Sequence, residues 1–218
     1  MGPVPTAIVF AGGDAPTTPA VQDLPAPAMV LAADSGLDHA HALGITVDVV
    51  VGDLDSVDPD VLEVAQRAGT VVERHPAAKD ATDLELALLA ARDRGAAEIL
   101  VVGGHGGRLD HFLANALLLA APVFADLRIR ARIGDAEITV VRDRAELNAA
   151  PGALCSLLPV GGPADGVRTE GLRFPLARET LLPGSTRGVS NEFVAPTAAV
   201  SLERGVLLAV LPEPRKDS

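Results

Sequence analysis

Residues 29–56 read MVLAADSGLDHAHALGITVDVVVGDLDS and contain the pattern that decides the fold. The apolar run at 29–33 predicts a strand, residues 36–43 have the period of a helix, and the apolar run at 47–51 predicts a second strand. A strand, a helix and a strand in this order are the repeating unit of a parallel sheet. Each predicted strand leads directly into a short segment that carries Asp residues.

The same alternation extends in both directions and covers residues 1–127. Further strands are predicted at 7–11, 70–73 and 99–102, and further helices at 59–68, 83–94 and 109–121. Pro59 behind Asp58 and the capping box Thr82-Asp83-Leu84-Glu85 mark two of the helix starts. We therefore expect residues 1–127 to form a mostly parallel, Rossmann-like α/β domain.

From residue 128 the pattern changes to short apolar runs separated by Gly and Pro. Strands are predicted at 128–132, 138–141, 154–158, 200–202 and 206–211. Short strands with frequent turn signals are typical of a small β-sandwich or barrel. The sequence thus predicts an α/β protein with a second, all-β sandwich domain at residues 128–218.

The composition indicates a soluble protein that binds neither nucleic acid nor membrane. The chain has 218 residues, of which 48% are apolar, and a formal net charge of −11. Its apolar runs are shorter than the roughly 18 residues of a membrane-spanning helix, and its acidity disfavours nucleic acid and anionic lipid. No Lys or Arg precedes Arg67, so the N-terminus lacks the basic region of a signal peptide. We expect a cytoplasmic location.

Carboxylates follow four of the predicted strands, where a parallel sheet binds its ligands. They are Asp34, Asp53, Asp55, Asp80, Asp83 and Asp110. Carboxylates gathered at one edge repel each other unless a cation compensates them, and Mg²⁺ prefers such hard oxygen ligands. We assign Asp53 and Asp55 as metal ligands, with Asp80 or Asp83 as the next candidate.

A glycine-rich segment, Gly103-Gly104-His105-Gly106-Gly107-Arg108, lies between a predicted strand and a helix. Its backbone N–H groups and Arg108 are suited to phosphate oxygens. The segment lacks the Lys of a Walker A loop and the last Gly of a dinucleotide fingerprint. We expect part of a triphosphate here, with Asp110 near the phosphates and with His111 and Asn115 ordering the loop.

Several motifs together resemble the thiamine pyrophosphokinases. They are Ala33-Asp34-Ser35-Gly36, Gly52-Asp53-Leu54-Asp55-Ser56, Lys79-Asp80-Ala81-Thr82-Asp83, Gly107-Arg108-Leu109-Asp110-His111 with Ala114-Asn115, and Thr186-Arg187-Gly188-Val189-Ser190-Asn191-Glu192. The resemblance implies a catalytic α/β domain, a thiamine-binding β domain, and a homodimer whose thiamine sites lie between subunits.

The resemblance also implies a reaction and residue roles. The thiamine hydroxyl attacks the β-phosphorus of ATP, and AMP leaves. ATP binding falls to Asp34, Gly104, Gly106, Gly107, Arg108, Asp110, His111 and Asn115; metal binding to Asp53, Asp55 and Asp83; and catalysis to Asp80, Asp83 and Asp110, with Asp80 or Asp83 as the proton acceptor. Thiamine binding falls to Arg187, Ser190 and Asn191.

The chain departs from the family pattern in two places. Ser35 stands where many relatives have Gly, and the chain has no Trp or Tyr to stack on thiamine, so that Phe193 is the ring nearest to the last motif. Two other function classes fit the same residues. One is another magnesium-dependent phosphotransferase or nucleotide hydrolase, and the other is a non-catalytic sensor of nucleotide or thiamine.

Overall fold

The computed structural model describes residues 4–78 and 80–212, and these divide into two compact units. The N-terminal unit contains Met1–Leu118 and Asp126–Gly134, and the C-terminal unit contains Leu119–Ala125 and Asp135–Ser218. The division differs from the predicted boundary after residue 127, because the strand at 128–133 pairs in parallel with the strand at 98–103 and so belongs to the first unit. Lys79, the first residue of the predicted motif Lys79-Asp80-Ala81-Thr82-Asp83, lies outside the described residues.

The N-terminal unit is built on a parallel sheet, which confirms the mixed α/β fold. Its strands are β1 (Thr6–Ala11), β2 (Met29–Ala33), β3 (Val49–Gly52), β4 (Val71–Arg74), β5 (Glu98–Gly103) and β6 (Arg128–Ile133). They lie in the order β6-β5-β1-β2-β3-β4, and each described pair runs in parallel. The chain moves outward from β1 to β4 and then returns to the other side of β1.

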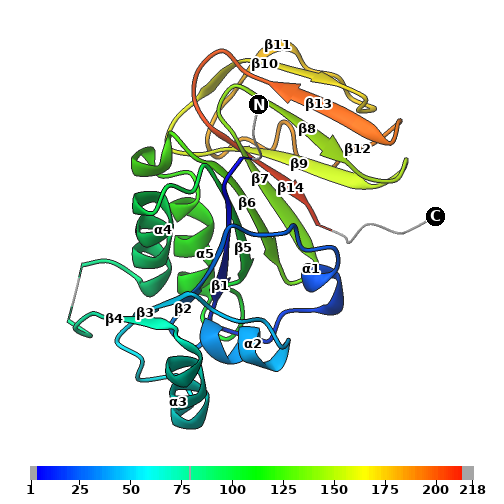
Figure 1. Ribbon diagram of the computed structural model, residues 1–218. Coiled ribbons are helices and arrows are strands. Elements are labelled where there is room, and N and C mark those ends of the chain that lie inside the picture. Colours follow the sequence, from blue (N-terminus) through cyan, green and yellow to red (C-terminus); the bar gives the residue numbers. More distant parts are fainter. Residues whose placement is uncertain (1–3, 79, 213–218) are drawn as a thin grey trace. The chain divides into compact units, whose positions relative to one another are not determined.

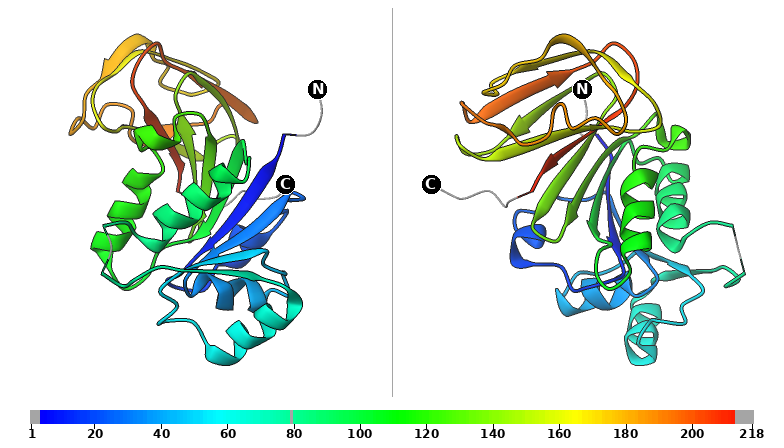
Figure 2. Two further views of the ribbon diagram at one scale, coloured as in Figure 1. Left: turned by 60° about the vertical axis from the view of Figure 1, so that its left-hand side comes forward. Right: turned by 180° about the vertical axis from the view of Figure 1, so that it is seen from behind.

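Helices cover both faces of this sheet, as Figures 1 and 2 show. They are α1 (Thr18–Val21), α2 (Gly36–Ala42), α3 (Pro59–Ala68), α4 (Asp83–Asp93) and α5 (Leu109–Leu118). On one face, Ile8, Phe10 and Leu37 belong to a buried apolar cluster with α1, α2 and α3. The opposite face packs on α4, whose Leu84, Ala87 and Leu88 are buried. Burial on both faces explains why the central strands β1, β2, β3 and β5 are almost wholly apolar.

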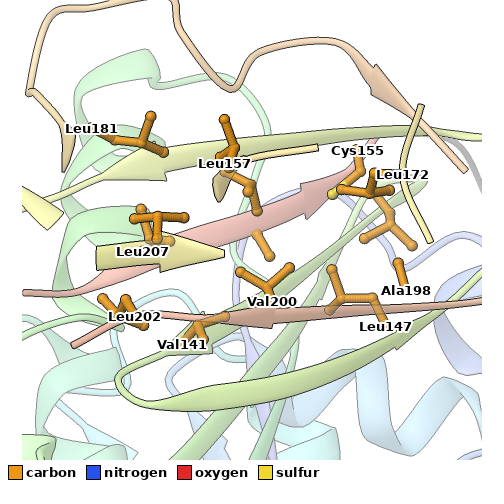
Figure 3. Close-up of a cluster of buried hydrophobic side chains, with 14 of the residues drawn as sticks. Val141, Leu147, Cys155, Leu157, Leu172, Leu181, Ala198, Val200, Leu202 and Leu207 are labelled. Atoms are coloured by element: carbon orange, nitrogen blue, oxygen red, sulfur yellow. The ribbon is translucent and has the colours of Figure 1, made fainter. Parts of the chain in front are cut away.

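The C-terminal unit consists of antiparallel strands around its own core. Its elements are η1 (Pro122–Phe124), β7 (Ala136–Val141), β8 (Arg144–Asn148), β9 (Leu154–Pro159), β10 (Ala164–Glu170), β11 (Ala177–Leu181), β12 (Asn191–Glu192), β13 (Thr197–Ser201) and β14 (Leu207–Leu211). One set of neighbours is β12-β9-β14-β7 and the other is β11-β10-β13-β8. Side chains from both sets, among them Leu157, Leu181 and Val200, form one cluster (Figure 3).

Among the described residues, no helix is both long and apolar enough to cross a membrane.

Candidate active site

Three carboxylates meet at the carboxyl ends of β2 and β3. One oxygen from each of Asp34, Asp53 and Asp55 lies within 4.8 Å of the others. Asp34 and Leu54 have positive φ angles of 48° and 63°, which side-chain-bearing residues rarely adopt. Such backbone conformations persist where surrounding structure holds them, and they occur often at functional sites. Here the N–H of Asp34 donates to the carbonyl of Val51 at 2.9 Å, so that the two loops are joined.

Asp83 brings a fourth carboxylate to the same place. A Cβ built on Gly52 would lie 3.0 Å from Oδ1 of Asp83 and 3.3 Å from Cβ of Asp34. Only a residue without a side chain leaves room for this approach. Thr82 caps α4 by accepting a hydrogen bond from the N–H of Glu85 at 3.2 Å, which makes Asp83 the first residue of the helix.

The electrostatics of this cluster favour a cation. Burial raises the pKa of Asp34 above its ordinary value, and the neighbouring charges of Asp83, Asp53 and Asp55 raise it further, against a lowering by the backbone N–H of Ser35. Oδ1 of Asp34 is buried and has no hydrogen-bond partner among the described residues. A buried carboxylate oxygen among like charges is costly unless a cation satisfies it, so this donor set fits Mg²⁺.

A cavity of about 570 Å³ in the N-terminal unit joins the carboxylates to the glycine-rich loop. Its lining includes the predicted residues Asp34, Asp53, Asp55, Asp83, Gly104, Gly106, Arg108, His111 and Asn115. Gly107, Asp80 and Asp110 are not among its lining residues. The structure thus brings most of the predicted N-terminal site residues to one cavity and leaves these three outside its wall.

The sequence analysis missed the loop after β1. Gly12 and Gly13 line the cavity, and a Cβ built on Gly13 would lie only 2.0 Å from the carbonyl oxygen of His105. The N–H of Asp14 donates to that same oxygen at 2.7 Å. The loop therefore lies directly against the glycine-rich loop after β5, at the point where the strand order reverses, which is where open sheets bind ligands. The pair Gly12-Gly13 directly after an apolar run is the sequence feature that could have indicated a loop at the ligand site.

Two side chains of α5 organise the glycine-rich loop. Nδ2 of Asn115 donates to the carbonyl of Gly104 at 3.3 Å, in keeping with the expectation that Asn115 orders the loop. Arg108 donates from Nε and Nη2 to the two carboxylate oxygens of Asp110, at 3.2 and 2.6 Å. This pair raises the pKa of Arg108 and lowers the pKa of Asp110 to about 2. Arg108 therefore has a carboxylate partner at the glycine-rich loop.

A second cavity of about 400 Å³ lies within the C-terminal unit. It is lined by Phe174, Leu176, Ser185, Thr186, Arg187, Gly188, Val189 and Asn191. Arg187 donates from Nε and Nη2 to Glu179 at 2.9 and 2.8 Å. Ser190 is exposed and does not line the cavity, and its N–H donates to the hydroxyl of Ser156 at 3.1 Å. Ser190 has a positive φ of 56°, as Asp34 and Leu54 have in two other predicted motifs.

Phe174, and not Phe193, is the ring that reaches this cavity. Phe193, the ring nearest to the last motif along the sequence, does not reach it, because its side chain is 1% exposed and belongs to the core of the unit. Phe174 is 55% exposed and lines the cavity. Phe174 lies farther from the motif along the chain, but its backbone hydrogen-bonds to the side chain of Asn191 within the motif.

Comparison with known proteins gives the same division of the chain. A family model described as "Thiamin pyrophosphokinase, catalytic domain" matches residues 24–131. A second model, "Thiamin pyrophosphokinase, vitamin B1 binding domain", matches residues 137–207. The two matches correspond to the two structural units except at 119–125, and together they cover most of the chain.

Individual relatives agree. The chain is 27% identical over 185 residues to the thiamine pyrophosphokinase of Bacillus subtilis, covering 81% of this chain and 84% of that protein. It is 31% identical over 155 residues to thiamine pyrophosphokinase 1 of Arabidopsis thaliana, covering 66% of this chain and 57% of the longer plant protein.

A solved structure shows the same fold over nearly the whole chain. The crystal structure of the Bacillus subtilis thiamine pyrophosphokinase superimposes with a TM-score of 0.82 at 24% identity, over 97% of this chain and all of the other. Taken with the two family models, these comparisons show that the chain belongs to the thiamine pyrophosphokinase family.

Proposed function

We propose that this protein is an active thiamine pyrophosphokinase, which transfers the diphosphoryl group of ATP to the hydroxyl of thiamine and releases AMP. The observation that carries the proposal is the N-terminal cavity, whose wall combines a cluster of carboxylates with a glycine-rich loop and Arg108. Transfer of this kind depends mainly on positioning and charge stabilisation, and these groups supply both. The match of the C-terminal unit to a vitamin B1 binding domain supports thiamine as the acceptor.

We assign Asp34, Asp53 and Asp55 to magnesium, with Asp83 as a further candidate ligand. The orphaned oxygen of Asp34 and the mutual closeness of the three carboxylates support this assignment. When bound there, Mg²⁺ would supply charge stabilisation for the phosphate oxygens of ATP. Asp34 thereby has a role as a metal ligand besides the ATP binding that the family resemblance implies.

We place the phosphates of ATP against the glycine-rich loop. Gly104 and Gly106 have positive φ angles of 87° and 110° and line the cavity, so their backbone can come close to a ligand. Arg108 would exchange its bond to Asp110 for one to a phosphate oxygen, since both acceptors suit a guanidinium in the same bidentate way. Gly107 and Asp110 then act next to the site, with His111 and Asn115 lining it.

Asp83 is the better candidate of the two for the proton acceptor. It lines the cavity beside the carboxylate cluster, whereas Asp80 is exposed and does not line it. Asp110 is poorly suited to that role, because Arg108 lowers its pKa to about 2 and makes it a weak base. We therefore retain Asp110 as the partner of Arg108.

We place thiamine in the cavity of the C-terminal unit. The ring of Phe174 supplies a flat apolar surface, and Arg187 and Ser190 supply polar groups nearby. Glu179 pairs with Arg187 and so offsets its charge, which suits a cationic thiazolium. In the proposed function, the N-terminal unit is a Rossmann-like catalytic domain. The C-terminal unit is an all-β, sandwich-type domain that binds thiamine.

We propose that the protein is a homodimer with thiamine sites between subunits. Leu109, Leu113 and Leu117, four residues apart on α5, are 70%, 51% and 57% exposed and form one apolar stripe. Exposed apolar residues in such a row often mark a protein interface. A cytoplasmic location, without nucleic-acid or membrane partners, completes the proposal and accords with the net charge of −11.

The test is incubation of the protein with ATP, Mg²⁺ and thiamine, followed by chromatography of the products. Equal amounts of AMP and thiamine diphosphate, formed only when all three are present, are the expected result. Formation of ADP, or ATP turnover that ignores thiamine, would favour another phosphotransferase or a hydrolase. Saturable binding of ATP or thiamine without AMP would favour the sensor.

A further inference from the structure

Asn191 is almost fully buried although it lies beside the C-terminal cavity. The residue is 3% exposed, and its backbone pairs with Cys155 of β9. Its Oδ1 accepts hydrogen bonds from the N–H groups of Phe174 at 3.0 Å and Glu192 at 2.9 Å, and its Nδ2 donates to the carbonyl of Phe174 at 2.7 Å. Both lone pairs of the oxygen and one of the two amide hydrogens are thereby engaged. Little capacity remains for a ligand.

These contacts extend a backbone ladder by one step. The N–H of Val194 donates to Gly171 at 3.0 Å, Leu172 forms a bridge with Phe193, and the N–H of Arg173 donates to the carbonyl of Glu192 at 2.8 Å. Phe174 comes next, where this pairing ends. A carboxamide has the same C=O and N–H groups as a peptide unit, so the Asn191 side chain takes the place of the next backbone partner.

The position of the Phe174 ring is linked to the hydrogen bonds that the Asn191 side chain makes with the Phe174 backbone. More than half of its surface is exposed, so packing restrains it less than the buried rings of Phe10, Phe124 and Phe193. The backbone conformation decides which rotamers a side chain can take. A fixed backbone at Phe174 therefore restricts the positions of the ring beside the cavity and lowers the entropy that is lost when a ligand stacks on it.

We propose that Asn191 is a positioning residue, whose carboxamide fixes the backbone of Phe174 and so holds the Phe174 ring as the wall on which a ring of thiamine stacks. The inference rests on the proposed function, in which this cavity takes thiamine. It replaces the expectation that Asn191 hydrogen-bonds to thiamine itself.

The composition offers a direct probe. The chain has no Trp or Tyr, so Phe174→Trp introduces a single strong fluorophore at the position of interest. Its anisotropy without thiamine reports how firmly the ring is held, and its quenching by added thiamine reports stacking. Asn191→Asp in this background keeps the size and the acceptor of residue 191 but removes the donor and places a carboxylate oxygen against the Phe174 carbonyl.

The expected result has three parts. Asn191→Asp lowers the anisotropy of the thiamine-free protein. It raises the thiamine concentration for half-maximal quenching roughly tenfold, because this factor corresponds to the loss of about one stacking contact. It leaves the KM for ATP unchanged. Asn148→Asp is the matched control, because Asn148 is an exposed Asn in β8 of the same unit whose side chain bonds to Thr197. It should change none of the three. Asn191→Ala, which buries no charge, serves as the second variant should Asn191→Asp fail to fold.

Other outcomes would overturn the inference. Unchanged anisotropy with weaker quenching is the behaviour of a direct thiamine ligand, and unchanged values of both would leave Asn191 without a role at the site. If Phe174→Trp forms thiamine diphosphate but thiamine does not quench it, the stacking wall is wrong while the proposed function stands. If the unsubstituted protein forms no thiamine diphosphate, the proposed function itself fails.

Discussion

Arg108 and Asp110 form a bidentate ion pair at the edge of the N-terminal cavity, with donor-acceptor distances of 3.2 and 2.6 Å. Both side chains are largely exposed, so the pair itself contributes little to stability. The pair places Arg108 beside the glycine-rich loop, and in the proposed function the guanidinium exchanges this carboxylate for a phosphate oxygen of ATP.

Arg108→Ala should weaken ATP binding while the protein stays folded. A hydrogen bond to a charged group contributes about 1.5–3 kcal/mol, so we expect the KM for ATP to rise roughly 10–100-fold and the KM for thiamine to stay the same. Steady-state kinetics with each substrate varied in turn make the measurement. Arg67→Ala is the control, because Arg67 pairs with Glu63 on α3, away from the lining of the cavity. A larger effect on thiamine than on ATP would contradict the assignment.

Asp53→Asn should abolish turnover and leave the fold intact, because it removes a charged ligand from the proposed magnesium site. Asp58→Asn is a matched control in the same loop region. Asp58 caps α3 by accepting from the N–H of Asp60 at 2.8 Å, and Asn caps helices equally well. Product formation and circular dichroism of both variants make the comparison. Turnover of Asp53→Asn at the unsubstituted rate would remove the metal assignment.

Asp34→Asn should stabilise the metal-free protein. The pKa of Asp34 is raised in the folded state, so the protonated form contributes stability that is present below the unfolded pKa and is lost as pH rises through the folded pKa. At neutral pH the ionised group therefore costs stability, and its neutral replacement should raise the melting temperature by a few degrees, about 2–4 °C per kcal/mol for a chain of this size.

The same variant should lose its response to magnesium. A ligand that binds only the folded protein raises its stability, so Mg²⁺ should raise the melting temperature of the unsubstituted protein at neutral pH and do so less at acid pH, where Asp34 is protonated. Thermal scans with and without Mg²⁺ at several pH values test both statements. A melting temperature of Asp34→Asn that still rises with Mg²⁺ as in the unsubstituted protein would show that Asp34 is not a ligand.

Much of the N-terminal unit follows from local sequence. The predicted helix at 59–68 coincides with α3, whose start is marked by the cap Asp58 and by Pro59. The predicted strand at 29–33 coincides with β2, which is an unbroken apolar run. The grouping of carboxylates could be predicted for a related reason, since the carboxyl ends of parallel strands share one edge of the sheet. Chain order alone brings Asp34 and Asp53 together.

The C-terminal unit was less predictable. The strands β8, β10 and β11 were missed, because their sequences RAELN, ADGVRTE and ARETL contain charged residues, or Gly, in place of a clear apolar alternation. β8 and β10 become strands through pairing with β13, far along the chain, and β11 through pairing with β10. The contact of Asn191 with Phe174 has the same origin, and no spacing rule in the sequence could have indicated it.

Leu113→Asp should dissociate the proposed homodimer. Leu113 lies in the middle of the apolar stripe on α5, and a buried, unpaired charge at an interface is strongly unfavourable. Size-exclusion chromatography with light scattering should give the dimer mass for the unsubstituted protein and the monomer mass for this variant. Val64→Asp on α3, where Val64 is also exposed, is the control and should remain dimeric. A monomeric unsubstituted protein would refute the dimer.

The choice between Asp83 and Asp80 as proton acceptor can be made by comparing two isosteric variants. Asp83→Asn removes a carboxylate that lines the cavity and should lower kcat by about 10²–10⁴-fold, the usual contribution of a positioned general base. Asp80→Asn changes an exposed carboxylate outside the lining and should leave kcat nearly unchanged, because it removes no group from the wall of the cavity. Because Asp83 is also a candidate metal ligand, the magnesium-dependent shift in melting temperature is measured for both. A large loss of kcat in Asp83→Asn with the magnesium-dependent shift retained supports Asp83 as the base. Loss of both kcat and the shift supports Asp83 as a metal ligand. A large loss of kcat in Asp80→Asn alone would reverse the assignment.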